Sequence, residues 1–371
     1  MDNQKINQPI HSRFQRAVEA DKKIHNAYLL VESRRHGLDF SAALGQSRRP
    51  DGSHLPAHTD QPVFMASVGK LFTAVLIGLL VEQGKLRYED TLAAYLDDDL
   101  LHHLHVFNGV DYSRQIRLSQ LLNHTSGLHD YFEDKPPKGE PMLNIILSQP
   151  QRHWTPREVI MWSKENLPAH SPPGKKFHYS DTGYHLLGLV VESVTAMPFA
   201  EALHRFIFEP LGMKHTFVIG HSRPQEDSPH GLAGVYFGDQ NVIDYASLSI
   251  DYAGGGVTAP LGELLVFLRA LADGKILRPA TLQRMRSDTA RFSIGIDYGY
   301  GTMNITTVPL IMPARFNCWG NAGSTGAFLF YHPGLDACLI GSFNQFGYAP
   351  KAIRFMLQIV DLLWKEIKPA A

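Results

Sequence analysis

Strand-like segments lie at both ends of this chain, while helical periodicity dominates its middle. Residues 26–33 and 38–47 are rich in apolar and β-branched positions and flank Gly37, which predicts a β-hairpin near the N-terminus. The C-terminal third contains further strand-like segments at 298–305, 326–333 and 336–345. Strands at both ends with helices between them predict an α+β protein: one sheet is built from both termini and flanked by helices, and a helical domain is inserted.

The helical segments set the expected domain boundaries. Apolar residues recur at i, i+3 and i+4 over 119–128, 155–167, 184–196 and 199–212. Further helices are expected at 12–22, from Ser67 to a left-handed cap at Gly84, and at 349–366. We therefore expect residues 1–86 and 251–371 to form a sheet-containing α/β domain and residues 87–250 to form an inserted, mainly helical domain.

Composition argues against several partners. The formal net charge of −1 provides no general basic field for nucleic acid or an anionic membrane. The most apolar segment, Leu71 to Val81, is too short to span a bilayer, and the N-terminus has no secretory signal pattern, so we expect a cytoplasmic protein. Cys318 and Cys338 form no CxxC pair, which favours two reduced thiols; no metal site or cofactor is expected.

A hydroxyl and an amine stand together where the most apolar helix begins. Ser67 and Lys70 are three residues apart, which places them on one helix face with about 5–6 Å between their Cβ atoms. A serine needs a neighbouring base to become a nucleophile, and a lysine in apolar surroundings loses part of its preference for the charged form. The pair therefore suggests a Ser-Lys catalytic unit. The alternative is a capping serine followed by a solvated lysine.

Two further segments carry polar or glycine-rich signals. Tyr179, Ser180 and Asp181 stand where a Gly/Pro-rich loop meets a helix; the simpler interpretation is that Asp181 only caps that helix. The run 319–333, WGNAGSTGAFLFYHP, has glycines entering a strand, which lets a ligand approach backbone N–H groups; the simpler interpretation is an edge bulge.

The order and spacing of these segments resemble those of the serine β-lactamase-like family, which includes class C β-lactamases, DD-peptidases and family VIII esterases. The resemblance covers about residues 55 to 345. It rests on SVGK (67–70), LLNHTSGL (121–128), PPGKKFHYSDTGYHLLG (172–188), EPLGM (209–213), GGGVTAPLGELLVFLRAL (254–271) and GSTGAFLFYHP (323–333). It implies a β-lactamase/transpeptidase-like fold with an antiparallel sheet and an active site between the two domains.

The resemblance also implies roles for individual residues. Ser67 would be the acylated nucleophile, Lys70 would help to remove its proton, and Tyr179 would act as general base and then as acid to the leaving group. The backbone N–H groups of Ser67 and Ser324 would form the oxyanion hole. Losing one such donor typically costs about 2.7–4 kcal/mol of transition-state stabilisation.

Two positions depart from the family's motifs. Tyr-x-Asn is Tyr-Ser-Asp here, so Asp181 could pair with Lys70, keep it charged and thereby favour the phenolate of Tyr179 as base. The usual Lys-Thr-Gly or His-x-Gly is Asn321-Ala322-Gly323, and a neutral Asn321 offers only a weaker hydrogen bond to a substrate carboxylate. We take Asp181, Asn321 and Gly323 as candidate substrate-binding residues.

These departures favour one function among several. We expect a serine hydrolase that forms an acyl-enzyme on Ser67, most simply an esterase on small carboxylic esters or lactones, with a small ester or amide as substrate. A β-lactamase, a D-amino-acid peptidase or carboxypeptidase, and an acyltransferase are alternatives with the same chemistry. A binding protein that kept the fold without catalysis is the alternative from another class.

Overall fold

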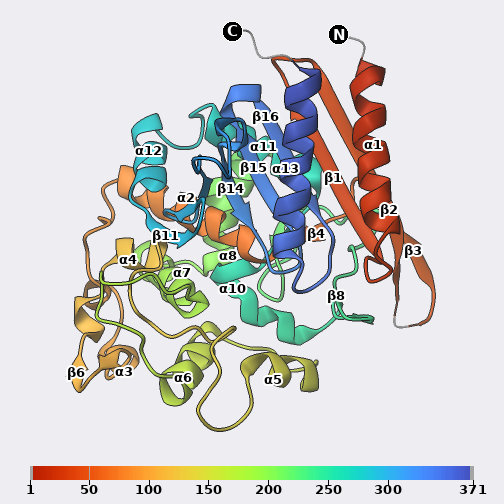
Figure 1. Ribbon diagram of the computed structural model, residues 1–371. Helices are drawn as coiled ribbons and strands as arrows, with labels where there is room; N and C mark the ends of the chain where they lie inside the picture. The colour runs from red at the N-terminus through yellow and green to blue at the C-terminus, as the bar shows by residue number, and fades with distance from the viewer. Residues whose placement is uncertain (1–2, 50, 368–371) are drawn as a thin grey trace.

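The structure is a computed structural model that describes residues 3–49 and 51–367. Within these residues, a nine-stranded antiparallel sheet forms the largest element, with the strand order β11-β12-β13-β14-β15-β16-β1-β2-β3 (Figure 1). The strands are β11 Ala290–Ser293, β12 Ile296–Tyr298, β13 Met303–Ile305, β14 Cys318–Ala322, β15 Phe328–His332, β16 Ala337–Ser342, β1 Asn26–Ser33, β2 Leu38–Arg48 and β3 His54–Pro56.

Both ends of the chain build this sheet, as the sequence predicts. Gly37 has a φ of 62°, a left-handed conformation that suits glycine, and it closes the β1–β2 hairpin. Strand β1 then pairs on its other side with β16, and Leu30 stands opposite Ile340. This pairing joins the N-terminal hairpin to the C-terminal strands in one sheet.

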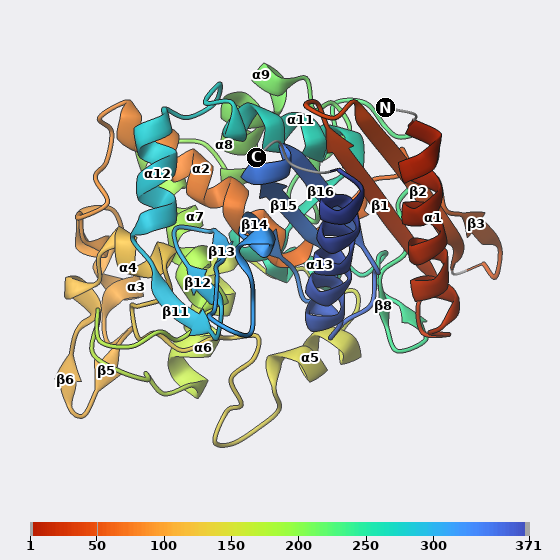
Figure 2. The ribbon, with the colours of Figure 1, turned by 45° about the horizontal axis from the view of Figure 1, so that its top comes forward.

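Helices cover both faces of the sheet (Figures 1 and 2). Helices α1 Asn3–Glu19 and α13 Ala349–Glu366 lie side by side on one face, and α2 Gly69–Glu82 and α11 Leu261–Ala272 lie on the other. Side chains alternate along β1, so Leu29 packs with the first pair of helices and Leu30 packs with the second. The sheet is therefore apolar on both faces, which makes this an α+β sandwich.

Helices dominate the segment between the two halves of the sheet. Its helical elements are α3 Asp98–Leu101, α4 Leu118–Leu122, α5 Met142–Ser148, α6 Pro156–Asn166, α7 Asp181–Thr195, α8 Phe199–Leu203, a π-helical turn His204–Phe208 and α9 Glu209–Leu211. Two more helices follow this segment, α10 Tyr252–Gly255 and α12 Pro279–Ser287. Helix α7 packs against α2, α4, α6, α8 and α10. In the described chain, residues 87–250 give no strand to the nine-stranded sheet. The domain boundaries at 86 and 250 stay a prediction.

Short strand pairs complete the fold. A three-stranded sheet has the order β4-β10-β7, and two small hairpins are β5–β6 and β8–β9. Their bounds are β4 Val63–Phe64, β10 Val257–Ala259, β7 Phe217–Val218, β5 Val106–Phe107, β6 Val110–Asp111, β8 Tyr236–Phe237 and β9 Gln240–Asn241. Because β4 leads directly to Ser67 and β10 follows Gly254, the three-stranded sheet fixes both segments beside the candidate site.

Some predicted elements differ in extent. The first helix begins at Asn3 rather than near residue 12, because Ile6, Ile10 and Phe14 recur at intervals of four and are buried against the sheet. The helix predicted at 119–128 ends at Leu122, and His124 has a φ of 59°. Segment 298–305 is not one strand but the end of β12, a turn, and β13.

Two further observations concern the thiols and the apolar helices. Cys318 and Cys338 are buried and unpaired. Among the described residues, no single helix has the length and apolar character needed to cross a membrane. One bent pair, Asp181–Thr195 with Phe199–Leu211, meets those criteria jointly.

Candidate active site

Ser67 lies in a single 3₁₀ turn, Ala66–Val68, that continues directly into α2. The preceding Ala66 has a φ of 45°, a conformation that residues with a Cβ rarely adopt and that is often found at functional sites. Gly69 lies against α10: a Cβ added there would stand 3.1 Å from the Cα of Gly255. The close approach of the two backbones therefore explains why the motif has a glycine between Ser67 and Lys70.

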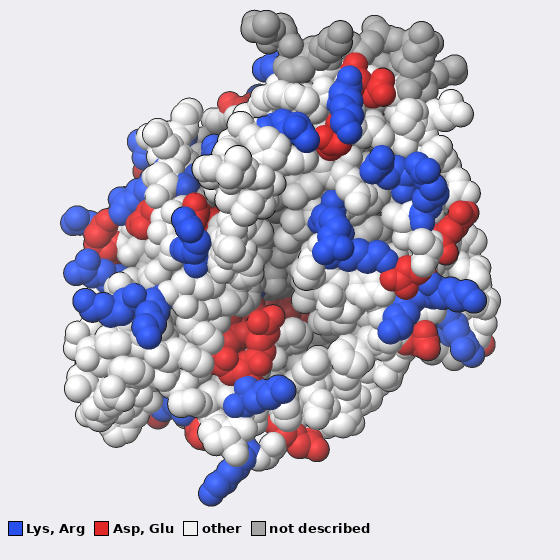
Figure 3. Space-filling view, in the orientation of Figure 1, with Lys and Arg blue, Asp and Glu red and all other residues white. Residues whose placement is uncertain are grey.

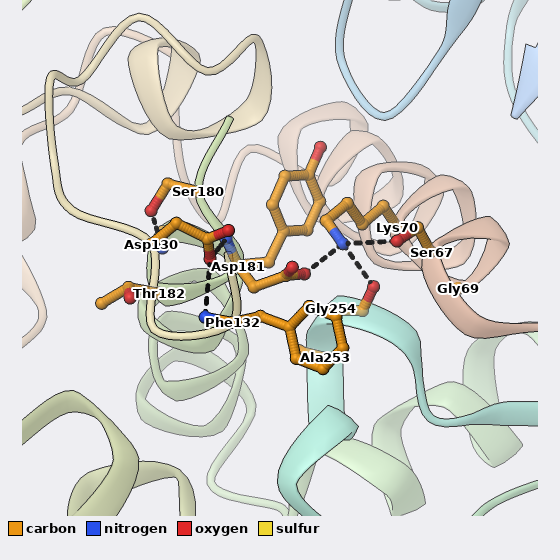
Figure 4. Close-up of polar contacts among 12 residues, drawn as sticks. Ser67, Gly69, Lys70, Asp130, Phe132, Ser180, Asp181, Thr182, Ala253 and Gly254 are labelled. Carbon is orange, nitrogen blue, oxygen red and sulfur yellow. Dashed lines mark hydrogen bonds and ion pairs between the residues drawn. The ribbon is translucent and has the colours of Figure 1, made fainter. Parts of the chain in front are cut away.

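Lys70 is fully buried, and each of its three N–H donors has an acceptor (Figure 4). Its Nζ lies 3.3 Å from Ser67 Oγ and 2.7 Å from the carbonyl oxygen of Gly254. The third partner is Asp181 Oδ1, with which Lys70 forms an ion pair. The predicted contact between the hydroxyl and the amine is present, and so is the predicted pairing of Lys70 with Asp181.

Tyr179 completes the predicted trio. Tyr179 lines the same cavity as Ser67, its ring centroid lies 4.9 Å from Lys70 Nζ, and its ring stacks on His124 with 4.2 Å between centroids. Burial, reinforced by the negative charge of Asp181, raises the pKa of Tyr179 well above its usual value. Burial, and then the charge of Asp181, work against the phenolate, and the role of Tyr179 as base stays a prediction.

Asp181 does not cap the helix that it begins. The N-cap of α7 is Ser180, whose Oγ accepts a hydrogen bond from the Gly183 N–H at 3.1 Å. The carboxylate of Asp181 is thereby free to turn toward Lys70, as Figure 4 shows. The simpler interpretation, in which Asp181 serves as the cap, is contradicted.

Further carboxylates surround this pair, and the sequence analysis did not select them. Asp130 Oδ1 accepts a hydrogen bond from the Asp181 N–H at 2.9 Å, and Glu133 and Asp251 line the same cavity as Ser67. Burial, and then the charge of Asp181, raises the pKa of all three: well above normal for Asp130, to about 7 for Asp251, and upward for Glu133. Within the described residues, the Asp251 carboxylate has no hydrogen-bond donor. In the sequence, only their closeness to the motifs could have indicated these carboxylates: Asp130 lies just after HTSGL, and Asp251 lies just before the GGG run.

The predicted oxyanion donors come from segments that the structure brings together. Gly323 follows β14 and lies against the turn that carries Ser67: a Cβ there would stand 2.6 Å from Met65 O and 3.2 Å from Ser67 N. Ser324 and Ser67 line one cavity. The lack of a side chain at Gly323 thus lets its backbone lie close to that of Met65 and Ser67. The pairing of the Ser67 and Ser324 N–H groups as an oxyanion hole stays a prediction.

Asn321 has a structural position instead of the expected substrate contact. It is fully buried in β14, and its Nδ2 donates to Tyr298 Oη at 3.1 Å and to Gly301 O at 2.8 Å. Its Oδ1 accepts from the Ala322 N–H at 2.7 Å. Because both amide donors are occupied inside the protein, this placement contradicts the expectation that the Asn321 side chain binds substrate.

These groups open into a small cavity of about 130 Å³. Its lining is Ser67, Phe132, Glu133, Tyr179, Asp181, Asp251, Phe292, Met303, Ala322, Ser324 and Ala349. A wider groove of about 750 Å³ adjoins it and shares Phe132, Glu133 and Ser324. Figure 3 shows acidic side chains gathered in the central hollow of this face. The nearest set of metal-type ligands, Asp134, His170 and His178, lies outside the cavity lining.

Comparison with known proteins assigns the family. A family model described as Beta-lactamase matches residues 14–360. The chain belongs to this family. Among curated relatives, the putative D-alanyl-D-alanine carboxypeptidase of Salmonella agona (strain SL483) is 30% identical over 194 residues, 51% of this chain and 42% of the relative. Penicillin-binding protein 4* of Bacillus subtilis (strain 168) is 28% identical over 264 residues, 66% of this chain and 53% of the relative. The chain thus spans about half the length of these relatives.

Solved structures of beta-lactamase-like proteins confirm the fold. The D-amino acid amidase of Ochrobactrum anthropi SV3 in complex with L-phenylalanine amide has a TM-score of 0.75 at 21% identity and covers 97% of this chain and 99% of its own. EstCE1, described as a hydrolase with promiscuous acyltransferase activity, has a TM-score of 0.74 at 21% identity, covering 96% and 99%. At these identities the likeness shows the shared β-lactamase/transpeptidase-like fold, and the activities of the neighbours differ from one another.

Proposed function

We propose that the protein is a serine hydrolase that forms an acyl-enzyme on Ser67 and acts on small carboxylic esters or lactones. The observation that carries the proposal is the contact of Lys70 Nζ with Ser67 Oγ while the same amine is ion-paired with Asp181. A serine hydroxyl becomes nucleophilic when a base stands within reach, and the Ser67–Lys70 distance of 3.3 Å meets that need once substrate closes the site.

The proton moves through the lysine in this scheme. Lys70 passes one proton to Asp181, and its freed lone pair accepts the proton of Ser67 as Oγ attacks the carbonyl carbon. The negative charge moves to the carbonyl oxygen, where backbone N–H groups stabilise it. Tyr179, held as a neutral phenol, donates its proton to the departing alcohol and regains one from the Lys70–Asp181 pair. Water then attacks the acyl-enzyme through the same groups in reverse.

The charge of the cavity favours esters over the usual substrates of β-lactamases. β-Lactams and peptide C-termini carry a carboxylate near the scissile bond. Asp181, Glu133 and Asp251 line the cavity, and the lysine beside them is already paired. A substrate carboxylate would face like charges in a partly desolvated site, which is unfavourable. A neutral ester has no such penalty.

A second candidate is an amidase or esterase for substrates that bear an amine. The Asp251 carboxylate faces the cavity, and no hydrogen-bond donor reaches it from the described residues. A substrate ammonium next to the carbonyl would provide both a donor and an opposite charge there. Rates on phenylalanine amide and on its desamino analogue, 3-phenylpropionamide, separate this candidate from a neutral-ester hydrolase.

The test of the proposal is covalent labelling of Ser67. Intact mass after treatment with a fluorophosphonate should show one adduct, which should be lost in Ser67→Ala. The matched control is Ser324→Ala, because this second cavity serine keeps its backbone N–H and should leave the adduct in place. Rates on p-nitrophenyl esters of increasing chain length, nitrocefin and D-alanyl peptides then assign the substrate. A protein that forms no adduct and hydrolyses none of these would be a binding protein.

A further inference from the structure

Two histidines from the loop between α6 and α7 meet an aspartate from the loop between α4 and α5, beside the tyrosine of the candidate site. His170 Nε2 lies 2.8 Å and His178 Nε2 lies 3.1 Å from the same oxygen, Asp134 Oδ2. The two imidazole rings stack with 3.4 Å between centroids and 21° between planes. All three ligand atoms lie within 4.8 Å of one another. We propose that Asp134, His170 and His178 bind a divalent transition-metal ion, with Zn²⁺ as the best match.

The spacing of the three atoms is close to that of a coordination sphere. Zn²⁺ binds imidazole nitrogen and carboxylate oxygen at about 2.0–2.2 Å, so neighbouring ligands of a tetrahedral ion stand about 3.3 Å apart. The two nitrogen–oxygen distances of 2.8 and 3.1 Å would need to open by only a few tenths of an ångström. The stacked rings must also turn, because the in-plane lone pairs of both Nε2 atoms have to converge on one ion.

Backbone contacts hold the ligands in place before any ion arrives. The Asp130 N–H donates to Asp134 Oδ2 at 2.7 Å and orients that carboxylate. The backbone N–H groups of His170 and His178 donate to the carbonyl oxygens of Gly127 and His124, at 2.9 and 2.8 Å. Such outer contacts fix the direction of ligands and typically change metal affinity by about 10–100-fold.

The donor set and its exposure indicate the type of ion. Two imidazole nitrogens and one carboxylate oxygen suit Zn²⁺, Ni²⁺ or Cu²⁺ rather than Mg²⁺ or Ca²⁺, which prefer oxygen ligands. The side chains of Asp134, His170 and His178 are 17%, 36% and 25% exposed, so a fourth position can be filled by water. A second group, His58, Asp60 and His230, is looser: His58 Nδ1 stands 3.7 Å from the Asp60 carboxylate, which is 75% exposed.

The position of the site gives the ion a structural consequence. Asp134 follows Glu133, which lines the cavity, and His178 precedes Tyr179. A bound ion would tie the loop that carries Glu133 to the segment that carries Tyr179. It should therefore stabilise the folded protein and restrict the catalytic phenol, independently of which substrate the cavity accepts.

The experiment measures binding and stability rather than turnover. The full chain is stripped with EDTA, dialysed, and titrated with Zn²⁺ by calorimetry and by competition with a chromophoric chelator. We expect one ion per chain with a micromolar Kd, a higher Tm with Zn²⁺, and the visible absorption of tetrahedral Co²⁺ when cobalt replaces zinc. His170→Ala should weaken binding at least about 10-fold, because it removes one of three ligands.

Control variants locate the ion. His58→Ala tests the looser group, and the His102→Ala/His103→Ala pair removes two histidines that also stack, at 3.9 Å between centroids. Both controls should bind Zn²⁺ with the parent affinity. Asp134→Asn keeps the shape of the side chain and should also weaken binding, so the result does not depend on one variant folding. No saturable binding of Zn²⁺, Ni²⁺ or Co²⁺, or unchanged binding by both His170→Ala and Asp134→Asn, would overturn the proposal.

Discussion

Two buried ion clusters, built from similar side chains, behave differently in this molecule. Lys70 lies with Asp181 at the candidate site, and Arg269 lies with Glu32 and Asp336 between α11 and the sheet. The side chains of Lys70 and Arg269 are 0% and 4% exposed, so both charges are shielded from water. The difference lies in how the surrounding carboxylates are satisfied.

In the Arg269 cluster, each carboxylate accepts a hydrogen bond from the guanidinium group. Nε donates to Glu32 Oε2 at 2.7 Å, Nη1 to Asp336 Oδ1 at 2.6 Å, and Nη2 to the carbonyl oxygen of Asp336 at 2.8 Å. Burial would raise the pKa of Asp336, but hydrogen bonds from Arg269 and Tyr331 outweigh it and lower that pKa. Each charge has a partner, so the cluster stabilises the junction of β1, β16 and α11.

The candidate site has more carboxylates than cations to pair with them. Lys70 is paired with one carboxylate, while Asp130, Glu133 and Asp251 have raised pKa values and form no ion pair with another described residue. Buried carboxyl groups with raised pKa values are costly for stability and useful for moving protons. The two clusters therefore differ in the number of carboxylates that lack a cation, rather than in residue type.

The largest expected effect comes from removing the amine at the site. Lys70→Met should lower kcat/KM for a p-nitrophenyl ester by about 10²–10⁴-fold, since the general base is lost. Steady-state rates with circular dichroism as a check on folding measure this. Lys275→Met, at a lysine that is 68% exposed, is the control and should keep the parent rate. A Lys70→Met rate within tenfold of the parent would remove the lysine from the mechanism.

The matching change in the structural cluster should affect stability instead. Arg269→Met removes the buried cation that pairs with both Glu32 and Asp336, which should lower the free energy of unfolding by about 3–5 kcal/mol. Urea denaturation measures the loss, and kcat per folded molecule should stay near that of the parent. Arg278→Met is the control: this side chain is 69% exposed, and its ion pair should be worth less than about 1 kcal/mol. A large drop in kcat for folded Arg269→Met would show that the clusters are coupled.

The sequence predicts the framework of the site because the framework is local. The 3₁₀ turn that carries Ser67 continues into α2, so helical spacing alone brings Ser67 and Lys70 together. Ser180 and Asp181 mark the start of α7. The nine-stranded sheet follows from apolar strands at both ends of the chain. These features depend on periods of two or of three to four residues, which a single sequence displays.

The rest depends on contacts between distant segments. Asp130, Glu133 and Asp251 lie in loops or short turns without periodicity, so their convergence follows only from the packed fold. Asn321 lies in β14, where every residue is buried and both faces are covered, so alternation of polarity does not reveal its direction. The state of the Tyr179 phenol likewise depends on its burial and on its distance from Asp181, which spacing along the chain does not give.

A smaller effect is expected from restoring the family's asparagine. Asp181→Asn removes the group that takes a proton from Lys70, so kcat should fall by about 10–10²-fold. It also removes a charge that raises the pKa of Asp251 and of Asp130, so both should titrate at lower pH in the variant. The pH dependence of kcat/KM on a neutral ester, with Asp99→Asn as a surface control, measures the change. An unchanged rate and profile would show that Asp181 and the base are not coupled.

The smallest expected effect concerns the sign of the pH dependence of stability. The pKa of Asp251 is about 7 in the folded protein, against about 3.9 in an unfolded chain. The folded state therefore holds a proton that the unfolded state releases, and Asp251 lowers stability progressively as pH rises from about 4 to about 7. Asp251→Asn should match the parent at pH 4 and be the more stable of the two at pH 8, as measured by urea denaturation.

Asp336→Asn should show the opposite sign, which makes it the matched control for Asp251→Asn. The folded pKa of Asp336 is lowered, so its contribution is present above the unfolded pKa and is lost as pH falls through the folded one. Its variant should be less stable than the parent at pH 8, and the difference should shrink toward acid. Asp251 faces Lys70, Asp181 and Tyr131, and none of these groups reverses that contrast near neutral pH. Parallel pH curves for the two variants would mean that the clusters are electrostatically alike, and the surplus charge at the site would then lose its link to catalysis.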